Sequence, residues 1–178
     1  MTQVAELGLT GSVDHLLFLR VDGDLILAAG RSQGVELIDV TTQRVIRVVG
    51  MGLPAEALAA LPADNGNDLL LVGGPDGVIR EYHPGTGTLR RQRAIGEGAI
   101  RDIAVSMHEP ANPVVAVALS NGVSLWHTAA NSLVDLPAVA QQIDARPFRL
   151  CMYSDRGERY LACAYTNGYV AVWGLGRP

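Results

Sequence analysis

Lysine is absent from this chain of 178 residues, and aromatic residues make up only 5% of it. All 14 basic residues are arginines, against 18 acidic residues, so the formal net charge is −4. The sequence contains no basic stripe of the kind that binding to nucleic-acid phosphates requires. We therefore expect no nucleic-acid partner. The use of arginine alone, with abundant Ala, Gly and Val, is typical of a GC-rich bacterial genome.

Long apolar runs are missing as well. No apolar stretch approaches the ~20 residues that span a bilayer. The first ten residues carry no positive cluster followed by an apolar run, as a secretory signal would. These features predict a cytoplasmic protein without a membrane partner, and the length suits one compact unit with its own core.

Residues that could bind a metal or carry out catalysis are few and scattered. The two cysteines, Cys151 and Cys163, and the four histidines do not stand at the spacing of a zinc site. No glycine-rich loop follows a strand and opens a helix, as a phosphate site would require. We predict no catalytic, metal-binding or cofactor-binding residue, and no enzyme activity. The cysteines flank the turn at 155–158, so we expect them to be reduced cross-strand neighbours in a hairpin.

The sequence does contain a repeat. Four short apolar runs are each followed by a polar turn with a glycine, and a further short strand comes after it. The runs cover residues 25–30, 69–74, 114–119 and 160–165, and the turn glycines are Gly34, Gly77, Gly122 and Gly168. These glycines are 43, 45 and 46 residues apart. The pattern predicts four hairpins, each with a glycine where a tight turn needs positive φ.

Further strands flank these hairpins. The upstream strands are expected at 15–20, 55–61, 103–107 and 148–153, and the downstream ones at 44–49, 88–93 and, more weakly, 132–136. Four short strands in a unit of about 40–45 residues is the period of a β-propeller blade. We therefore predict an all-β fold without long helices. The segment 55–63 is rich in Ala and Leu, which favour helix, but the repeat places a strand there.

The repeating unit resembles the WD repeat. Two segments match the first turn of that repeat, Leu19-Arg20-Val21-Asp22-Gly23 and Tyr153-Ser154-Asp155-Arg156-Gly157. The tryptophan position of the repeat is occupied by Ile38, Tyr82, Trp126 and Trp173, spaced 44, 44 and 47 residues apart. The resemblance covers almost the whole chain and implies a single β-propeller domain with blades at 12–50, 51–96, 97–141 and 142–178.

One further expectation follows from this resemblance. The hydrogen-bonded Asp–His–Ser/Thr–Trp network of the family cannot be completed in any unit, so we expect stability to come mainly from apolar packing between blades. A β-sandwich of short strands is the alternative fold.

The two ends of the repeat array are offset. The fourth blade lacks an outer strand after its third, whereas residues 4–11 form a spare strand before the first blade. The resemblance implies that such a strand closes the ring as the outer strand of the last blade. Because rings of this family mostly have seven or eight blades, we expect half of an eight-bladed ring, completed as a homodimer with strand exchange. A longer propeller completed by another chain and a closed four-bladed ring are the alternatives.

The expected function is a protein–protein interaction scaffold that binds another protein through loops at one end of the propeller. The candidate contact residues enter the first strand of a blade or lie in a glycine turn: His15, Arg31, Glu56, Arg101 and Arg146. The alternative is an enzyme or small-ligand-binding propeller with a site in the central channel, but the inner positions read as Leu, Ala, Val and Cys. The only basic cluster, at 90–93, is expected to be a solvated face of an outer strand.

Overall fold

The computed structural model describes residues 9, 11–63, 65–106, 112–137, 145–155 and 158–176. These residues form fifteen β-strands, and no helix is found among them, which confirms the predicted all-β class. The strands build four antiparallel sheets in chain order. Sheet 1 contains β1 (His15–Val21), β2 (Asp24–Arg31), β3 (Gly34–Asp39) and β4 (Arg44–Val49), and sheet 2 contains β5 (Ala57–Pro62), β6 (Asp68–Gly73), β7 (Val78–His83) and β8 (Thr88–Ala94). Sheet 3 contains β9 (Ile100–Val105), β10 (Val114–Leu119), β11 (Gly122–His127) and β12 (Ser132–Asp135), and sheet 4 contains β13 (Pro147–Asp155), β14 (Glu158–Tyr165) and β15 (Val170–Gly176).

The glycine turns between the second and third strands mostly have the predicted geometry. Positive φ is found at Gly34, Gly77 and Gly168. At Gly122 the prediction is wrong, because the glycine already lies in β11, opposite Leu119. Ser120 and Asn121 make that turn instead.

The segment rich in Ala and Leu contains β5 and not a helix. Ala57, Ala59 and Leu61 are buried, and the residues that alternate with them are half-buried. This alternation is that of a strand whose sheet is covered on both faces. Packing against the two neighbouring sheets thus overrides the helical propensity of the sequence.

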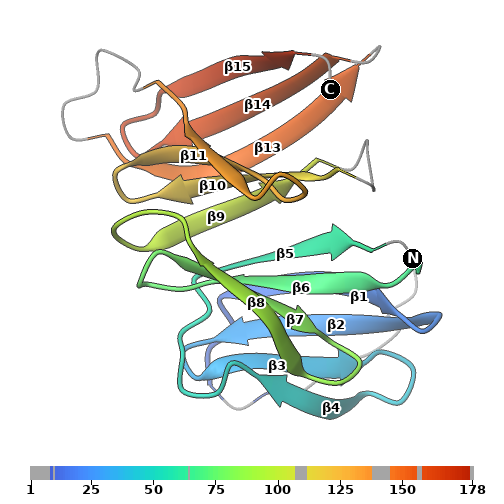
Figure 1. Cartoon of the computed structure of the whole chain (residues 1–178). Coiled ribbons are helices and arrows are strands. Elements are labelled where there is room, and N and C mark those ends of the chain that lie inside the picture. The colour runs from blue at the N-terminus through green and yellow to red at the C-terminus, as the bar shows by residue number, and fades with distance from the viewer. Residues whose placement is uncertain are drawn as a thin grey trace, which may run out of the picture.

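The four sheets stack in chain order, with sheet 1 at one end of the stack and sheet 4 at the other (Figure 1). Each first strand contacts the first strand of the next sheet, so β1, β5, β9 and β13 form one series. Apolar clusters fill the three interfaces. Leu19 and Leu37 meet Leu70 between sheets 1 and 2, Leu71 and Ile79 meet Val117 between sheets 2 and 3, and Ala116 and Leu125 meet Leu161 between sheets 3 and 4.

The residue at the tryptophan position faces the preceding sheet wherever there is one. Tyr82 packs against sheet 1, Trp126 against sheet 2 and Trp173 against sheet 3. In sheet 1 the same position is Ile38, which is paired with Leu27, and no sheet precedes it. The face of sheet 1 that carries this row of residues therefore lies at the end of the stack.

Sheet 4 has its free face at the other end. Its side chains point away from sheet 3 in the row formed by Cys151, Ala162 and Val172. Among the described residues this sheet has three strands, whereas each of the others has four. The predicted closing strand at 4–11 lies outside the described residues, apart from its positions 9 and 11.

The prediction that the two cysteines are direct cross-strand neighbours is wrong. Cys151 is paired with Ala162 and Cys163 with Leu150, so the register differs by one residue from the predicted one. Successive residues of a strand point to opposite faces. Cys151 is consequently exposed on the free face of sheet 4, while Cys163 is buried against sheet 3, and both thiols are free.

Candidate interaction surface

The connections from sheet 1 to sheet 2 and from sheet 2 to sheet 3 lie at the same ends of the strands, along one side of the stack (Figure 1). We call this side the connection end. The backbone N–H of Ala55 donates to the carbonyl of Arg31 at 3.0 Å, which ties sheet 2 to sheet 1. The N–H of Ile100 donates to the carbonyl of Gly74 at 3.1 Å, which ties sheet 3 to sheet 2. Main-chain hydrogen bonds between sheets therefore hold the loops at this end in place.

All five residues predicted to contact a partner are found at the connection end: His15, Arg31, Glu56, Arg101 and Arg146. The structure brings Glu56 and Arg101 together, with 3.6 Å between a carboxylate oxygen and a guanidinium nitrogen, across sheets 2 and 3. Arg31 forms an ion pair with Glu36 of its own sheet. His15 and Arg146 form no ion pair with any described residue, so the five side chains do not make one connected cluster.

The same end carries a charged pair that the sequence analysis missed. The guanidinium of Arg80, in β7, donates at 2.6 Å to Asp76, which lies in the turn between β6 and β7. This hydrogen bond holds the pKa of Asp76 below its ordinary value and raises the pKa of Arg80. The available signal was the Asp of the Pro-Asp-Gly turn followed by an Arg four residues later, which a tight hairpin brings back beside it.

A cavity of about 310 Å³ opens between sheets 3 and 4 at the connection end. Its walls include Leu136, Pro147, Tyr165 and Trp173. Burial raises the pKa of Tyr165 to about 12, with smaller contributions from Cys163 beside it. Burial likewise raises the pKa of the Cys163 thiol to about 11. Both groups are neutral at physiological pH, so neither supplies a base or a thiolate nucleophile there.

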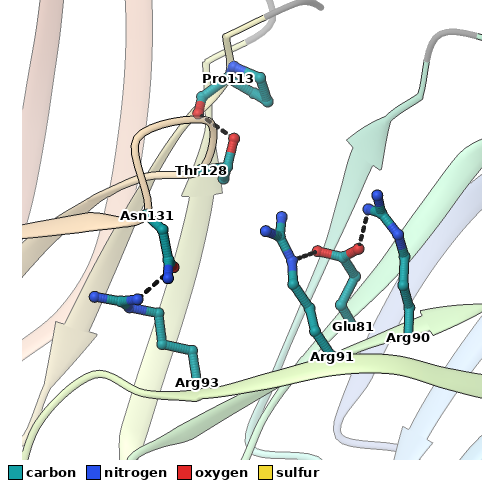
Figure 2. A network of polar contacts seen from close by, with 7 residues as sticks. All are labelled: Glu81, Arg90, Arg91, Arg93, Pro113, Thr128 and Asn131. Atoms are coloured by element: carbon teal, nitrogen blue, oxygen red, sulfur yellow. Dashed lines mark hydrogen bonds and ion pairs between the residues drawn. The ribbon is translucent and has the colours of Figure 1, made fainter.

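The basic cluster on β8 is not the solvated face that the sequence predicted. Figure 2 shows Glu81, whose side chain is fully buried, between Arg90 and Arg91. Arg91 donates from Nε to the carboxylate at 2.7 Å, and Arg90 donates to the other oxygen. Glu81 is paired with Arg91 and Tyr82 with Leu89, so Arg90 is the extra residue of a β-bulge. The bulge lets two consecutive arginines reach one carboxylate.

The basic cluster also joins sheet 2 to sheet 3. The guanidinium of Arg91 lies 4.6 Å from the ring centre of Trp126. Arg93 donates to Asn131 in the turn before β12, as Figure 2 shows. The indole N–H of Trp126 is buried and has no hydrogen-bond partner among the residues that the structure describes. This agrees with the expectation that the polar network of the WD repeat is incomplete, and an arginine stacked on the ring takes part in the packing instead.

No group of three or more His, Cys, Asp or Glu side chains within the described residues could hold a metal ion. No helix in the described part of the chain is long and apolar enough to cross a membrane. The connection end instead presents fixed main chain with charged pairs on its surface, an arrangement that suits contacts with another macromolecule.

Comparison with solved structures identifies the fold as propeller-like. The computationally designed protein Ika4 is 20% identical and superposes with a TM-score of 0.67, over 99% of this chain and 100% of that one. The designed protein Ika8 is 16% identical with a TM-score of 0.65, over 93% of this chain and 48% of that one. A chain from the crystal structure of an active polycomb repressive complex 2 in the basal state is 16% identical with a TM-score of 0.74, over 93% of this chain and 38% of that one. The chain thus spans the whole of one structural neighbour and half or less of the other two. No family model matches the sequence, and no curated protein matches it significantly.

Proposed function

We propose that this protein is a non-catalytic protein-interaction scaffold of the WD-repeat type. Its four sheets act as four propeller blades, which are half of an eight-bladed ring. A protein partner binds to the loops of the connection end. The observation that carries the proposal is the surface there, where main-chain hydrogen bonds between sheets fix the loops next to Glu56, Arg101 and Arg31.

Rigid loops favour partner binding because little conformational entropy is lost when they are covered. The charged pairs supply directional contacts, and partly exposed charges fix the orientation of a partner more than its affinity. Glu56 and Arg101 retain side-chain exposures of 33% and 43%, so both remain available to a partner. The likeness to a chain solved within a protein complex agrees with such a role.

The composition of the first strands of the sheets favours binding at the loops and not at a site in the central channel. A channel site would need carboxylates or imidazoles that converge from several blades. The middle residues of β5 and β9, such as Ala59, Ala60 and Ile103, are apolar. Asp102 does lie on β9, but its carboxylate accepts a hydrogen bond from the backbone N–H of Leu150 at 2.7 Å and so joins sheets 3 and 4.

The proposal can be tested by affinity capture from lysate of the source cells with the tagged full chain. Two charge reversals are compared, Arg101→Glu at the connection end and Arg44→Glu, which is exposed at the start of β4 at the opposite end. The true partner should be recovered at least tenfold less with Arg101→Glu, and unchanged with Arg44→Glu. A tenfold loss corresponds to about 1.4 kcal/mol of binding free energy. Equal recovery with both variants would contradict binding at the connection end.

A further inference from the structure

The two end faces of the stack are apolar and carry exposed side chains. On sheet 1, Leu16 and Phe18 have exposures of 64% and 57%. On sheet 4, Tyr153 and Val172 have exposures of 65% and 64%. Side chains of this kind are normally buried, and contiguous exposed apolar faces mark sites of association.

The register of the strands shows which surface each free face is built to meet. In sheets 2 to 4 the row that contains the tryptophan position packs on the preceding sheet. In sheet 1 the equivalent row consists of Phe18, Leu27, Ile38 and Val45, and it lies on the face turned away from sheet 2. Phe18 and Val45 are exposed at the two ends of this row, whereas Ile38 at its centre is buried. Among the described residues no preceding sheet packs on this row.

Sheet 4 has the complementary surface. The row of sheet 3 that packs on sheet 4 contains Ala116 and Leu125. Its counterpart one sheet later contains Cys151, Ala162 and Val172, which are small or apolar in the same way. The free face of sheet 4 thus continues the pattern by which each sheet of this chain receives the next.

We infer that a second copy of this chain covers both faces, with sheet 4 of each copy packed on sheet 1 of the other. The inference rests on the proposed eight-bladed ring. We call each contact between sheet 4 of one copy and sheet 1 of the other a joint. Each chain carries both of the faces that meet at a joint, so a second copy supplies the matching surface without a further protein. The contact is head-to-tail, and such contacts build either a closed ring or an open fibre. Two copies of four blades close the ring at eight.

The lengths of the structural neighbours agree with closure by two copies. The chain covers the whole of designed Ika4 but 48% of designed Ika8, so two chains have the length of the longer propeller-like protein. The outer edge of β15 carries no fourth strand among the described residues.

Two substitutions test the head-to-tail joint. Phe18→Asp places a charge on the free face of sheet 1, and Val172→Asp does so on the free face of sheet 4. Leu89→Asp is the control, because Leu89 is similarly exposed, at 47%, but lies on β8 away from both faces. Light scattering should give about twice the chain mass of 18.9 kDa for the wild type and the control. Each of the other two variants should give a single chain mass.

Mixing the two variants separates a head-to-tail joint from a symmetric one. The mixture retains one joint without any substitution, so it should form a heterodimer, whereas neither variant dimerises alone. A joint between two copies of the same face would leave one of the variants dimeric. Circular dichroism checks that the variants are folded, and Leu16→Asp and Val170→Asp repeat the test at other exposed positions of the two faces.

Cys151 provides an independent measurement at the joint. It lies on the free face of sheet 4 and should react with a bulky maleimide in the Phe18→Asp variant but be protected in the wild type. A monomeric wild type, an open series of larger oligomers, or a dimer that survives both substitutions overturns the inference. None of these results affects capture of a partner through Arg101. The proposed function is overturned instead if the protein dimerises but Arg101→Glu and Arg44→Glu capture the partner equally.

Discussion

Glu81→Gln should destabilise the protein strongly, although it preserves the shape of the side chain. The carboxylate of Glu81 is fully buried and accepts hydrogen bonds from two guanidinium groups. Removing one partner of a buried ion pair costs about 3–5 kcal/mol. The side chains of Arg90 and Arg91 keep exposures of 48% and 34%, so water compensates part of this loss. We expect the free energy of unfolding to fall by about 2–3 kcal/mol.

Substitution of Arg90 and of Arg91 should lower the free energy of unfolding by different amounts. Arg90→Gln leaves Arg91 on the carboxylate and removes only a half-exposed charge, so it should cost about 1 kcal/mol or less. Arg91→Gln also removes the stacking on Trp126, which is worth about 0.5–2 kcal/mol. The expected order of destabilisation is therefore Glu81→Gln, then Arg91→Gln, then Arg90→Gln.

The measurement is urea unfolding followed by circular dichroism and tryptophan fluorescence, with all variants at one protein concentration. The concentration must be fixed because assembly of copies adds to the apparent stability. An unchanged slope of free energy against urea shows that the change lies in stability and not in the extent of unfolding. A cost below 1 kcal/mol for Glu81→Gln, or an equal cost for Arg90→Gln, would refute the argument that burial of this carboxylate makes its partners essential.

Two other predictions concern a turn and the response to alkali. A Cβ at Gly77, where φ is +70°, would lie 2.0 Å from the carbonyl oxygen of Gly96, whereas Gly23, with φ of +90°, has no atom within 4 Å of such a Cβ. Gly77→Ala should therefore lower the unfolding free energy at least twice as much as Gly23→Ala, for which the backbone cost alone is about 1–2 kcal/mol; equal costs in urea unfolding would contradict the clash. Burial raises the pKa of Cys163 from 9.0 to about 11 and that of Tyr165 from 10.0 to about 12, so folding favours their neutral forms and this stabilisation is complete below pH 9. It should be lost as pH rises from 9 through 12, and Cys163→Ala should flatten the fall in melting temperature over that window, while an unchanged fall would exclude the thiol as a cause.

Most of the fold could be predicted from the repeat in the sequence. Each hairpin was predictable because its turn and its two short apolar strands are local in sequence, and four equivalent units at one period reinforce each other. The repeat also placed β5 in a segment of helical composition, at Ala57–Pro62. Long-range packing decides the conformation there, and only the period of the repeat reports on that packing.

The features that were missed depend on single-residue register. The bulge beside Glu81 turns an apparently solvated arginine cluster into a buried ion pair, and nothing in the spacing of the arginines indicates an extra residue in β8. The positions of Cys151 and Cys163 also depend on register. Their pairing differs by one residue from the predicted one, and a shift of one residue exchanges the two sides of a strand, so the two thiols lie on opposite faces. The candidate contact residues all lie at the connection end, but the pairing of Glu56 with Arg101 depends on how the sheets stack in space and could not be read from the sequence.

The proposed assembly and the proposed partner binding depend on each other, because a sheet in a repeat fold is stabilised chiefly by its neighbours. Sheets 2 and 3 pack on a neighbour through both faces, while sheets 1 and 4 do so through one. The residues at the connection end differ in the same way. Glu56 and Arg101 lie where two sheets of one chain meet, whereas His15 and Arg146 lie at the start of the two end sheets. A partner that contacts Glu56 and Arg101 alone should bind a single chain. A partner that also contacts His15 or Arg146 needs the surface across the joint between copies, so its capture should be lost with the monomeric Phe18→Asp variant.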